Sequence, residues 1–166
     1  HKYCCTTPAM RPAQDSCVTL SGLVLASLGQ GMARQMYVNL PVKDLNKSVE
    51  FFTKLGFTFN PQFTDEKATC MIVGENIFVM LLVEPFFKSF TKKDICDTST
   101  SNESIIALSS DSREQVDELV DKAIEAGGTQ PNETIDQGWM YSRAFLDLDG
   151  HMWETMYMDM SGMPQS

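Results

Sequence analysis

Glu154 is the residue of this chain best placed to do chemistry. The residues around it alternate as in a β-strand, so that Met152, Glu154 and Met156 share one face. Burial among apolar neighbours raises the pKa of a carboxyl group, and such tuning suits a general base that moves a proton on a carbon beside a carbonyl group. The pattern predicts a catalytic Glu154. The alternative is an exposed or salt-bridged glutamate, since glutamate is rarely buried without a partner.

Two further side chains are candidates for stabilising charge in such a reaction. Tyr37 would donate a hydrogen bond and Arg143 would supply a positive charge, provided that both face the same cavity as Glu154. Both could equally be residues at the rim. Aromatic, thioether and amide side chains on the predicted strands would line the ligand pocket. These predicted pocket residues are Asn39, Met80, Trp139, Tyr141 and Met152.

Composition and charge exclude several classes of function. The chain has 166 residues with 13 Lys+Arg against 22 Asp+Glu, a formal net charge of -9. Such a charge argues against binding to nucleic acid or to an anionic membrane surface, and we expect neither as a partner. No phosphate-binding loop, GxGxxG turn, HExxH helix or nucleophile elbow is present. Nucleotide-dependent, zinc-protease and serine-hydrolase functions are therefore not expected.

The first 31 residues differ from the rest of the chain. They contain Cys4, Cys5 and Cys17 and almost no charge, and their apolar run, residues 17–28, is too short to span a bilayer. We interpret residues 1–31 as a disordered or misassigned leader, with a targeting segment as the alternative. The folded domain is predicted over residues 32–162. Only Cys70 and Cys96 remain there, without metal-ligand spacing, which favours a reducing, cytoplasmic setting.

One pattern occurs twice within the predicted domain. A strand at residues 36–40 precedes a helix capped by Asp44 and ended by Gly56, and a strand at residues 105–108 precedes a helix capped by Asp111. Three strands follow each helix: residues 58–63, 67–73 and 77–83 in the first copy, and residues 129–135, 139–146 and 152–158 in the second.

The repeat predicts an α+β fold of two βαβββ modules. The modules cover about residues 33–84 and 103–160, and residues 85–102 link them. Packed side by side, they would form one curved mixed sheet with the helices outside. The concave inner face of that sheet is the predicted ligand-binding surface.

The same segments resemble the vicinal oxygen chelate superfamily, which contains glyoxalase I, bleomycin-resistance proteins and extradiol dioxygenases. The resemblance rests on residues 37–45 (YVNLPVKDL), 48–52 (SVEFF), 55–57 (LGF) and 147–154 (DLDGHMWE), and it covers residues 33–160. The chain is most similar to the branch described as predicted lactoylglutathione lyases. The resemblance implies a glyoxalase-like fold and a homodimer.

The resemblance also implies a divalent metal, held by His, Gln or Glu on the first and last strand of each module. Glu154 keeps a ligand-type side chain, whereas Tyr37, Leu81 and Ile105 stand at the other positions. One carboxylate is too few for a catalytic metal, so we expect no cofactor. A metal held by Glu154 is the alternative. His151 lies beside a predicted Asp149–Gly150 turn, and we expect it to face solvent rather than a metal.

Two functions remain, and both concern a small-molecule ligand. The first is a glyoxalase-like enzyme that performs lactoylglutathione-lyase-like isomerisation or lyase chemistry on a small carbonyl compound, with Glu154 as the base. The second is a non-catalytic protein of the bleomycin-resistance type that sequesters a small molecule in the same concave face. A structural dimer without a ligand is a weaker third reading, because a curved sheet of this kind usually holds something.

Overall fold

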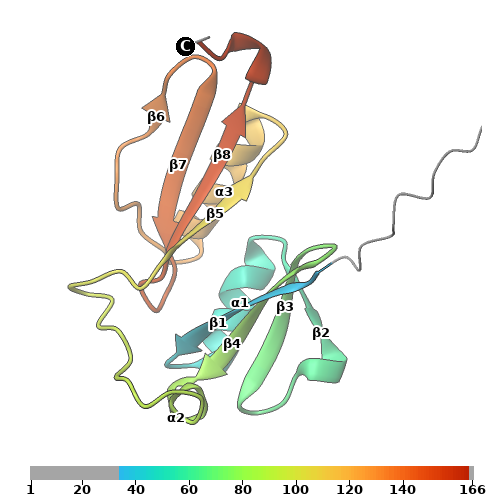
Figure 1. The fold of residues 1–166 in the computed structure, drawn as a ribbon, viewed down its shortest axis with the longest axis vertical. Coiled ribbons are helices and arrows are strands. Elements are labelled where there is room, and N and C mark those ends of the chain that lie inside the picture. The colour runs from blue at the N-terminus through green and yellow to red at the C-terminus, as the bar shows by residue number, and fades with distance from the viewer. Residues whose placement is uncertain (1–33, 165–166) are drawn as a thin grey trace, which may run out of the picture. The chain divides into compact units, whose positions relative to one another are not determined.

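The computed structural model describes residues 34–164. The predicted leader, residues 1–31, lies outside the described residues. The described residues all belong to one compact unit, in which two four-stranded sheets each carry a long helix (Figure 1). None of the helices described here has the length and apolar character needed to cross a membrane.

The first module contains β1 (Met36–Val42), α1 (Leu45–Lys54), β2 (Thr58–Asn60), the 3-10 helix η1 (Pro61–Phe63), β3 (Ala68–Gly74) and β4 (Ile77–Val83). The strand order is β1-β4-β3-β2, with β1 parallel to β4 and the other pairs antiparallel. Asp44 caps α1 as predicted, because its side chain accepts a hydrogen bond from the backbone N–H of Lys47 at 3.1 Å. Gly56, with φ of 99°, follows the helix in the left-handed region that glycine adopts freely.

The second module repeats this arrangement. It contains β5 (Ile105–Ser109), α3 (Arg113–Glu125), β6 (Ile135–Asp136), β7 (Met140–Leu146), β8 (Met152–Met158) and the 3-10 helix η2 (Met160–Gly162), with strand order β5-β8-β7-β6. The predicted cap of α3 was one residue too early. Ser112, not Asp111, occupies the cap position and accepts from the N–H of Gln115 at 3.3 Å.

The predicted fold class is confirmed, with four differences in detail. The eight strands form two separate four-stranded sheets instead of one continuous sheet. The predicted strand 58–63 ends at Asn60, because Pro61 begins η1. The predicted strand 129–135 is reduced to an isolated bridge between Thr129 and Leu146 and to the short β6. The linker begins with a short helix, α2 (Glu84–Lys88), that the sequence did not predict.

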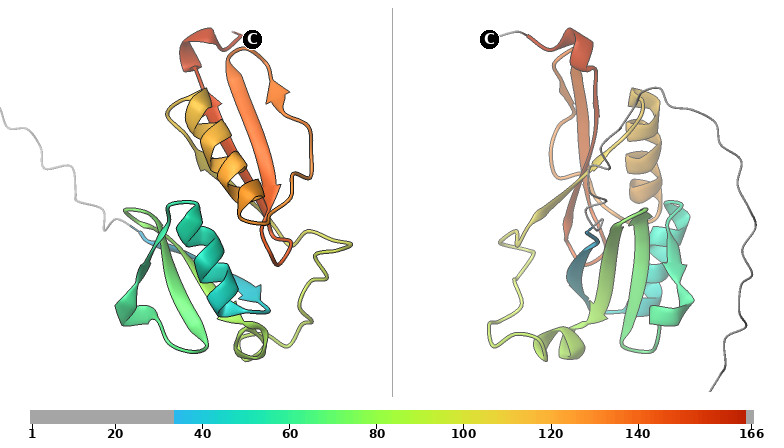
Figure 2. Two further views of the ribbon diagram at one scale, coloured as in Figure 1. Left: turned by 180° about the vertical axis from the view of Figure 1, so that it is seen from behind. Right: turned by 45° about the vertical axis from the view of Figure 1, so that its right-hand side comes forward.

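Both modules contribute to a single hydrophobic core. Figure 2 shows α1 and α3 on the same side of the two sheets when the molecule is seen from behind. The ring of Phe52 on α1 lies 5.2 Å from that of Trp153 on β8, and the ring of Phe51 lies 6.3 Å from that of Phe145 on β7, measured between centroids. All four side chains are fully buried. The modules are therefore one folding unit instead of two independent domains.

Each sheet also has a face that points away from α1 and α3. We define the first open face by Tyr37, Asn39, Cys70, Phe78 and Met80, which alternate with core residues on β1, β3 and β4. We define the second open face by Ala107, Ser142, Ala144, Met152, Glu154 and Met156, which alternate in the same way on β5, β7 and β8. These faces hold the candidate site residues.

Candidate functional site

Glu154 lies at the centre of the second open face. It is half-buried on β8, and its direct cross-strand neighbours are Ala107 on β5 and Ala144 on β7. The hydroxyl of Ser142 donates a hydrogen bond of 2.7 Å to Oε1 of Glu154. Glu154 also lines a cavity of about 170 Å³, together with Met152 and with residues of the loop before β6. The small side chains of the two alanines thus leave space beside the Glu154 carboxylate, to which Ser142 donates a hydrogen bond.

Arg143 does not share this face. It follows Ser142 on β7 and therefore points to the opposite side of the sheet, toward α3. Its Nη1 lies 2.8 Å from Oδ1 of Asp117 and 3.0 Å from Oδ1 of Asp121. Burial alone would lower the pKa of Arg143, but these two carboxylates raise it above its ordinary value. The expectation that Arg143 stabilises charge beside Glu154 is contradicted by this placement.

Tyr141 also faces α3 instead of the ligand surface. Its hydroxyl donates to Oδ1 of Asp117 at 2.8 Å, and the guanidinium of Arg113 lies 5.0 Å from the centre of its ring. Burial raises the pKa of Asp117, yet the hydrogen bonds from Arg143 and Tyr141 more than offset this, so the pKa of Asp117 is lowered. The side chain of Tyr141 therefore belongs to a structural network on the helix side.

The remaining predicted residues lie on the other sheet or at a strand end. Tyr37 is on the first open face, 48% exposed, and its ring stacks on that of Phe78 with centroids 4.9 Å apart. Asn39 and Met80 lie opposite each other on the same face. Trp139 precedes β7 and is half-buried. Of all the predicted site residues, Glu154 and Met152 alone lie together on the second open face.

The donor set on these faces does not fit a divalent metal. Glu154 is flanked by two alanines, and Leu81, one of the positions considered for a ligand, is fully buried in the core. Within residues 34–164, no group of three or more His, Cys, Asp or Glu side chains could hold a metal ion. We derive no chemical step through a metal for this site.

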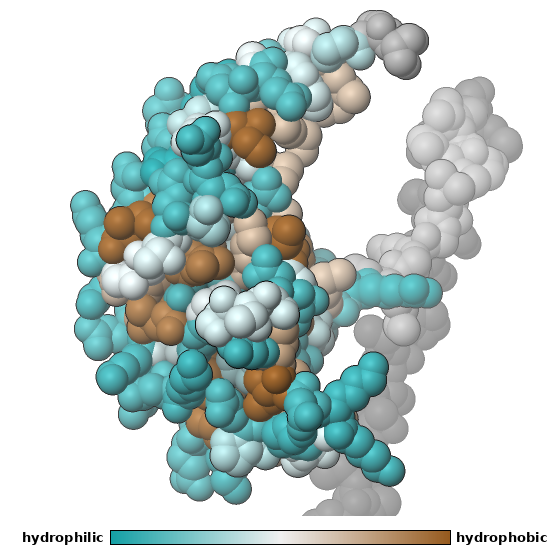
Figure 3. All heavy atoms as spheres, turned by 90° about the vertical axis from the view of Figure 1, so that its left-hand side faces the viewer, coloured by the Kyte–Doolittle hydropathy of each residue, from teal (hydrophilic) through white to brown (hydrophobic). Residues whose placement is uncertain are grey.

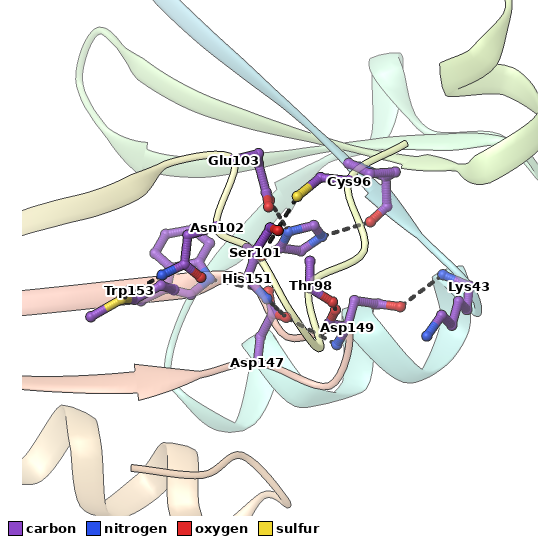
Figure 4. A network of polar contacts seen from close by, with 12 residues as sticks. Lys43, Cys96, Thr98, Ser101, Asn102, Glu103, Asp147, Asp149, His151 and Trp153 are labelled. Atoms are coloured by element: carbon purple, nitrogen blue, oxygen red, sulfur yellow. Dashed lines mark hydrogen bonds and ion pairs between the residues drawn. The ribbon is translucent and has the colours of Figure 1, made fainter. Parts of the chain in front are cut away.

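The predicted environment of His151 is wrong. The side chain was expected to face solvent at the mouth of a hairpin, but it is 2% exposed. Its Nε2 lies 2.7 Å from the carbonyl oxygen of Pro41 on β1, and its Nδ1 contacts the carboxylate of Glu103, which precedes β5 (Figure 4). His151 therefore connects the second module to the first through Pro41 and also holds the segment that leads into β5.

The whole turn around His151 has this connecting role. Oδ1 of Asp149 accepts from the backbone N–H of Lys43 at 2.9 Å, and its Oδ2 accepts from the hydroxyl of Ser48 at 3.2 Å. Asp147, which is buried, accepts from Nε1 of Trp153 at 3.1 Å. We call residues 147–151 and these partners the module junction. The sequence indicated a tight turn here, but no sequence pattern pointed to its partners in the first module, which are between 101 and 110 residues away.

The partners of His151 determine its charge. Both ring nitrogens face acceptors, a carbonyl oxygen and a carboxylate, so both must carry a proton for both contacts to be hydrogen bonds. Burial alone would lower the pKa of His151, but Asp147, the Pro41 carbonyl and Glu103 together raise it. Burial raises the pKa of Asp147, with His151 opposing this effect. The imidazolium form of His151 is therefore the one that fits the module junction.

The stability of the protein is expected to fall as pH rises above about 6.5 and through the raised native pKa of His151. The raised pKa of His151 means that its contribution to stability is complete below the unfolded value of about 6.5 and is lost as pH rises through the native pKa. Urea denaturation at several pH values measures this, with His151→Gln as the control that lacks the titrating group. A midpoint that is constant in the wild type, or that falls equally in the variant, would contradict the assignment.

Comparisons with known proteins agree with this fold. Residues 34–74 match the family model described as bleomycin resistance protein-like N-terminal. The hypothetical protein SA1046 from S. aureus is 35% identical, with a TM-score of 0.65 over 77% of this chain and 96% of that chain. No curated protein matches the sequence.

Two further solved structures share the fold at low identity. A glyoxalase/bleomycin resistance protein/dioxygenase family enzyme from Burkholderia phytofirmans PsJN is 17% identical, with a TM-score of 0.63 over 76% of this chain and 99% of that chain. The fosfomycin resistance protein FosX from Listeria monocytogenes is 19% identical, with a TM-score of 0.55 over 78% of this chain and 97% of that chain. Together with the paired βαβββ modules and the matched N-terminal segment, these similarities show that the chain belongs to the vicinal oxygen chelate superfamily.

Proposed function

We propose that this chain binds a small organic molecule on the second open face, beside Glu154, without converting it. The superfamily includes both enzymes and resistance proteins, as the names of the Burkholderia and Listeria proteins illustrate. The observation that favours binding is the separation of the predicted catalytic groups. Glu154 has a cavity beside it, but Arg143 faces α3 and Tyr37 lies on the other sheet. A general base without a nearby group to stabilise charge is poorly equipped for turnover.

A lyase or isomerase is the second candidate, because one oxygen of Glu154 is left free to accept a proton. Among residues 34–164, Ser142 is the one donor to this carboxylate, at Oε1, and two alanines flank it. Such an enzyme would act on a small carbonyl compound, with lactoylglutathione-lyase-like chemistry as the specific case. Turnover of the hemithioacetal of methylglyoxal and glutathione by the purified protein, abolished in Glu154→Gln, would establish this function and overturn the binding proposal.

A homodimer is part of the proposal. Apolar side chains are exposed on the described part of the chain, and Figure 3 shows brown patches between hydrophilic side chains on one side of it. Several of them lie on the open-face sides of the two sheets. Those that do not line the cavity beside Glu154 are Tyr37, Ile72 and Met158. A second copy of the chain would cover this surface.

We place the protein in a reducing, cytoplasmic setting, since both described cysteines are free thiols.

Ligand binding at the second open face is expected to be lost in Ala144→Leu. Ala144 lies directly beside Glu154 and lines its cavity, so a larger side chain would fill the space that a ligand needs. Binding is measured with a panel of small fragments by ¹H–¹⁵N NMR, in which the amides of β5, β7 and β8 should shift in the wild type. We expect affinity to fall by about tenfold or more in the variant.

The control is Thr53→Leu, which also introduces a leucine but at an exposed position on α1. It should leave the fragment-induced shifts unchanged, and circular dichroism confirms that both variants fold. Fragments that bind Ala144→Leu as well as they bind the wild type would exclude the second open face as the site. A panel in which no fragment shifts these amides would overturn the proposed function.

A further inference from the structure

We propose that the second open face selects ligands that carry a positive charge, with Glu154 as their counter-ion. This inference rests on the proposed function and names the ligand class of the same site. The inference rests on the surroundings of Glu154. Its carboxylate is half-buried, forms no ion pair with the described residues, and lies in a cavity into which no basic side chain points.

The charged side chains available to a ligand in the cavity are carboxylates. The other open-face positions on β5, β7 and β8 carry alanine, serine, isoleucine, leucine or methionine. The loop before β6 adds Asn132 and Glu133, a second carboxylate. Arg143 also borders the cavity, but its guanidinium is turned to the other side of the sheet, where Asp117 and Asp121 hold it. No basic side chain of the described residues therefore neutralises Glu154 from within the cavity.

The surroundings of Glu154 leave its charge available. The hydroxyl of Ser142 satisfies one lone pair of Oε1, and the flanking positions Ala107 and Ala144 cannot cover the rest of the carboxylate. A ligand that enters the cavity displaces water from this group. Removing water from a carboxylate is costly unless a partner replaces it, and a ligand anion would add like-charge repulsion. A cationic ligand offsets the desolvation cost by pairing with the carboxylate, and it causes no like-charge repulsion.

The size and lining of the cavity narrow the class further. About 170 Å³ accommodates one small head group, and a planar amidinium or guanidinium can donate two hydrogen bonds to a carboxylate. Met152, Ile105 and Ile135 border the same cavity. Methionine and aliphatic side chains form an adaptable apolar surface. The expected ligand is thus a small organic cation with an apolar or aromatic body.

Three probes of nearly equal shape and different charge test the inference. Benzamidine is a cation at neutral pH, benzamide is neutral and benzoate is an anion. Their affinities for the full chain are measured by ¹H–¹⁵N NMR titration in buffer containing EDTA, so that no metal ion competes for Glu154. We expect benzamidine to bind about tenfold more tightly than benzamide, with shifts at the amides of β7 and β8, and benzoate to bind more weakly than either.

Glu154→Gln should remove this preference. The glutamine keeps the shape of the side chain and an oxygen that accepts the hydrogen bond from Ser142, so the fold is expected to survive. Benzamidine should bind about tenfold more weakly to the variant, whereas benzamide should change by less than about twofold. The matched control is Glu125→Gln at the end of α3, an exposed glutamate away from the open faces, which should leave all three affinities unchanged.

The outcomes separate this inference from the proposed function. Benzamide or benzoate binding as tightly as benzamidine, or a benzamidine affinity that Glu154→Gln does not change, overturns the preference for a cation. If neutral fragments still shift the amides of β5, β7 and β8, the binding function stands without that preference. If none of the three probes binds, the inference is overturned. If the fragment panel also fails to bind this face, the proposed function is overturned with it.

Discussion

Replacing Trp153 with alanine is expected to lower the free energy of unfolding by about 4 kcal/mol. Trp153 is fully buried on β8, where it stacks on Phe145 with centroids 6.1 Å apart and contacts Phe52 of the other module. Its indole N–H also donates to Asp147 in the module junction. The substitution removes the largest side chain of the shared core and leaves a buried carboxylate without this donor. Urea denaturation followed by far-UV circular dichroism measures the loss.

Trp153→Phe is the matched control for this prediction. It keeps an aromatic ring in the core but removes the N–H that donates to Asp147, so we expect a smaller loss of about 1–2 kcal/mol. Unfolding should remain a single transition in both variants, since α1 and β8 contribute to the same core. A loss below about 1 kcal/mol in the alanine variant would contradict the packing described here. Two separate transitions would show that the modules unfold independently.

Replacing His151 with alanine is expected to lower the free energy of unfolding by about 3 kcal/mol. The substitution removes both hydrogen bonds of the imidazolium, leaving the Pro41 carbonyl oxygen without its donor and the Glu103 carboxylate without its partner. Pro41 belongs to β1 of the first module, so the loss of its hydrogen bond weakens the connection between the modules directly. Chemical denaturation at pH 6, where the imidazolium contributes fully, measures the effect.

Lys88→Ala provides the contrast between a buried pair and an exposed pair. Lys88 lies 3.1 Å from Asp94, but the side chain of Asp94 is fully exposed, so we expect a loss of about 0.5 kcal/mol or less. A comparable loss in both variants would show that burial adds nothing at His151. A gain in stability on replacing His151 would mean that burying His151 and its polar partners costs more free energy of desolvation than their hydrogen bonds contribute.

The module junction also bears on the candidate site. It holds the turn that leads into β8, the strand that carries Glu154, and it ties this turn to β1 through His151 and to α1 through Asp149. The hydrogen bonds of Asp149 and His151 fix the position of this turn. The residues of the segment 147–154 thus divide into two roles: the turn supports the fold, and Glu154 faces the ligand surface.

Much of the fold could be predicted from residues close together in the chain. The apolar run Ile77–Val83 and the pattern of Met152–Met158 predicted β4 and β8 at the bounds observed, and Asp44 predicted the start of α1. The repetition of strand, helix and three strands predicted the two modules, and the resemblance of four motif segments indicated their family. Errors arose where a local signal was shifted or interrupted, as at Ser112 and at Pro61.

The candidate site was only partly accessible to the same reasoning. The two-residue period of β8 by itself determined that Met152 and Glu154 share a face, since successive side chains of a strand alternate between its faces. The same period separates Arg143 from Ser142, and the register of β7 against β8 decided which of them lies beside Glu154. Strand register depends on pairing between distant segments, and a shift by one residue exchanges the two faces.

The sequence by itself thus determined the two modules, their family and the identity of the one carboxylate on the predicted ligand surface. Only the tertiary structure decided that His151 is buried between two acceptors, that Arg143 and Tyr141 face α3, and that the strands form two sheets. The physical reason is the range of the interactions. Helix caps, turns and alternation act over a few residues, whereas the partners of His151, Asp149 and Arg143 lie between 13 and 110 residues away along the chain.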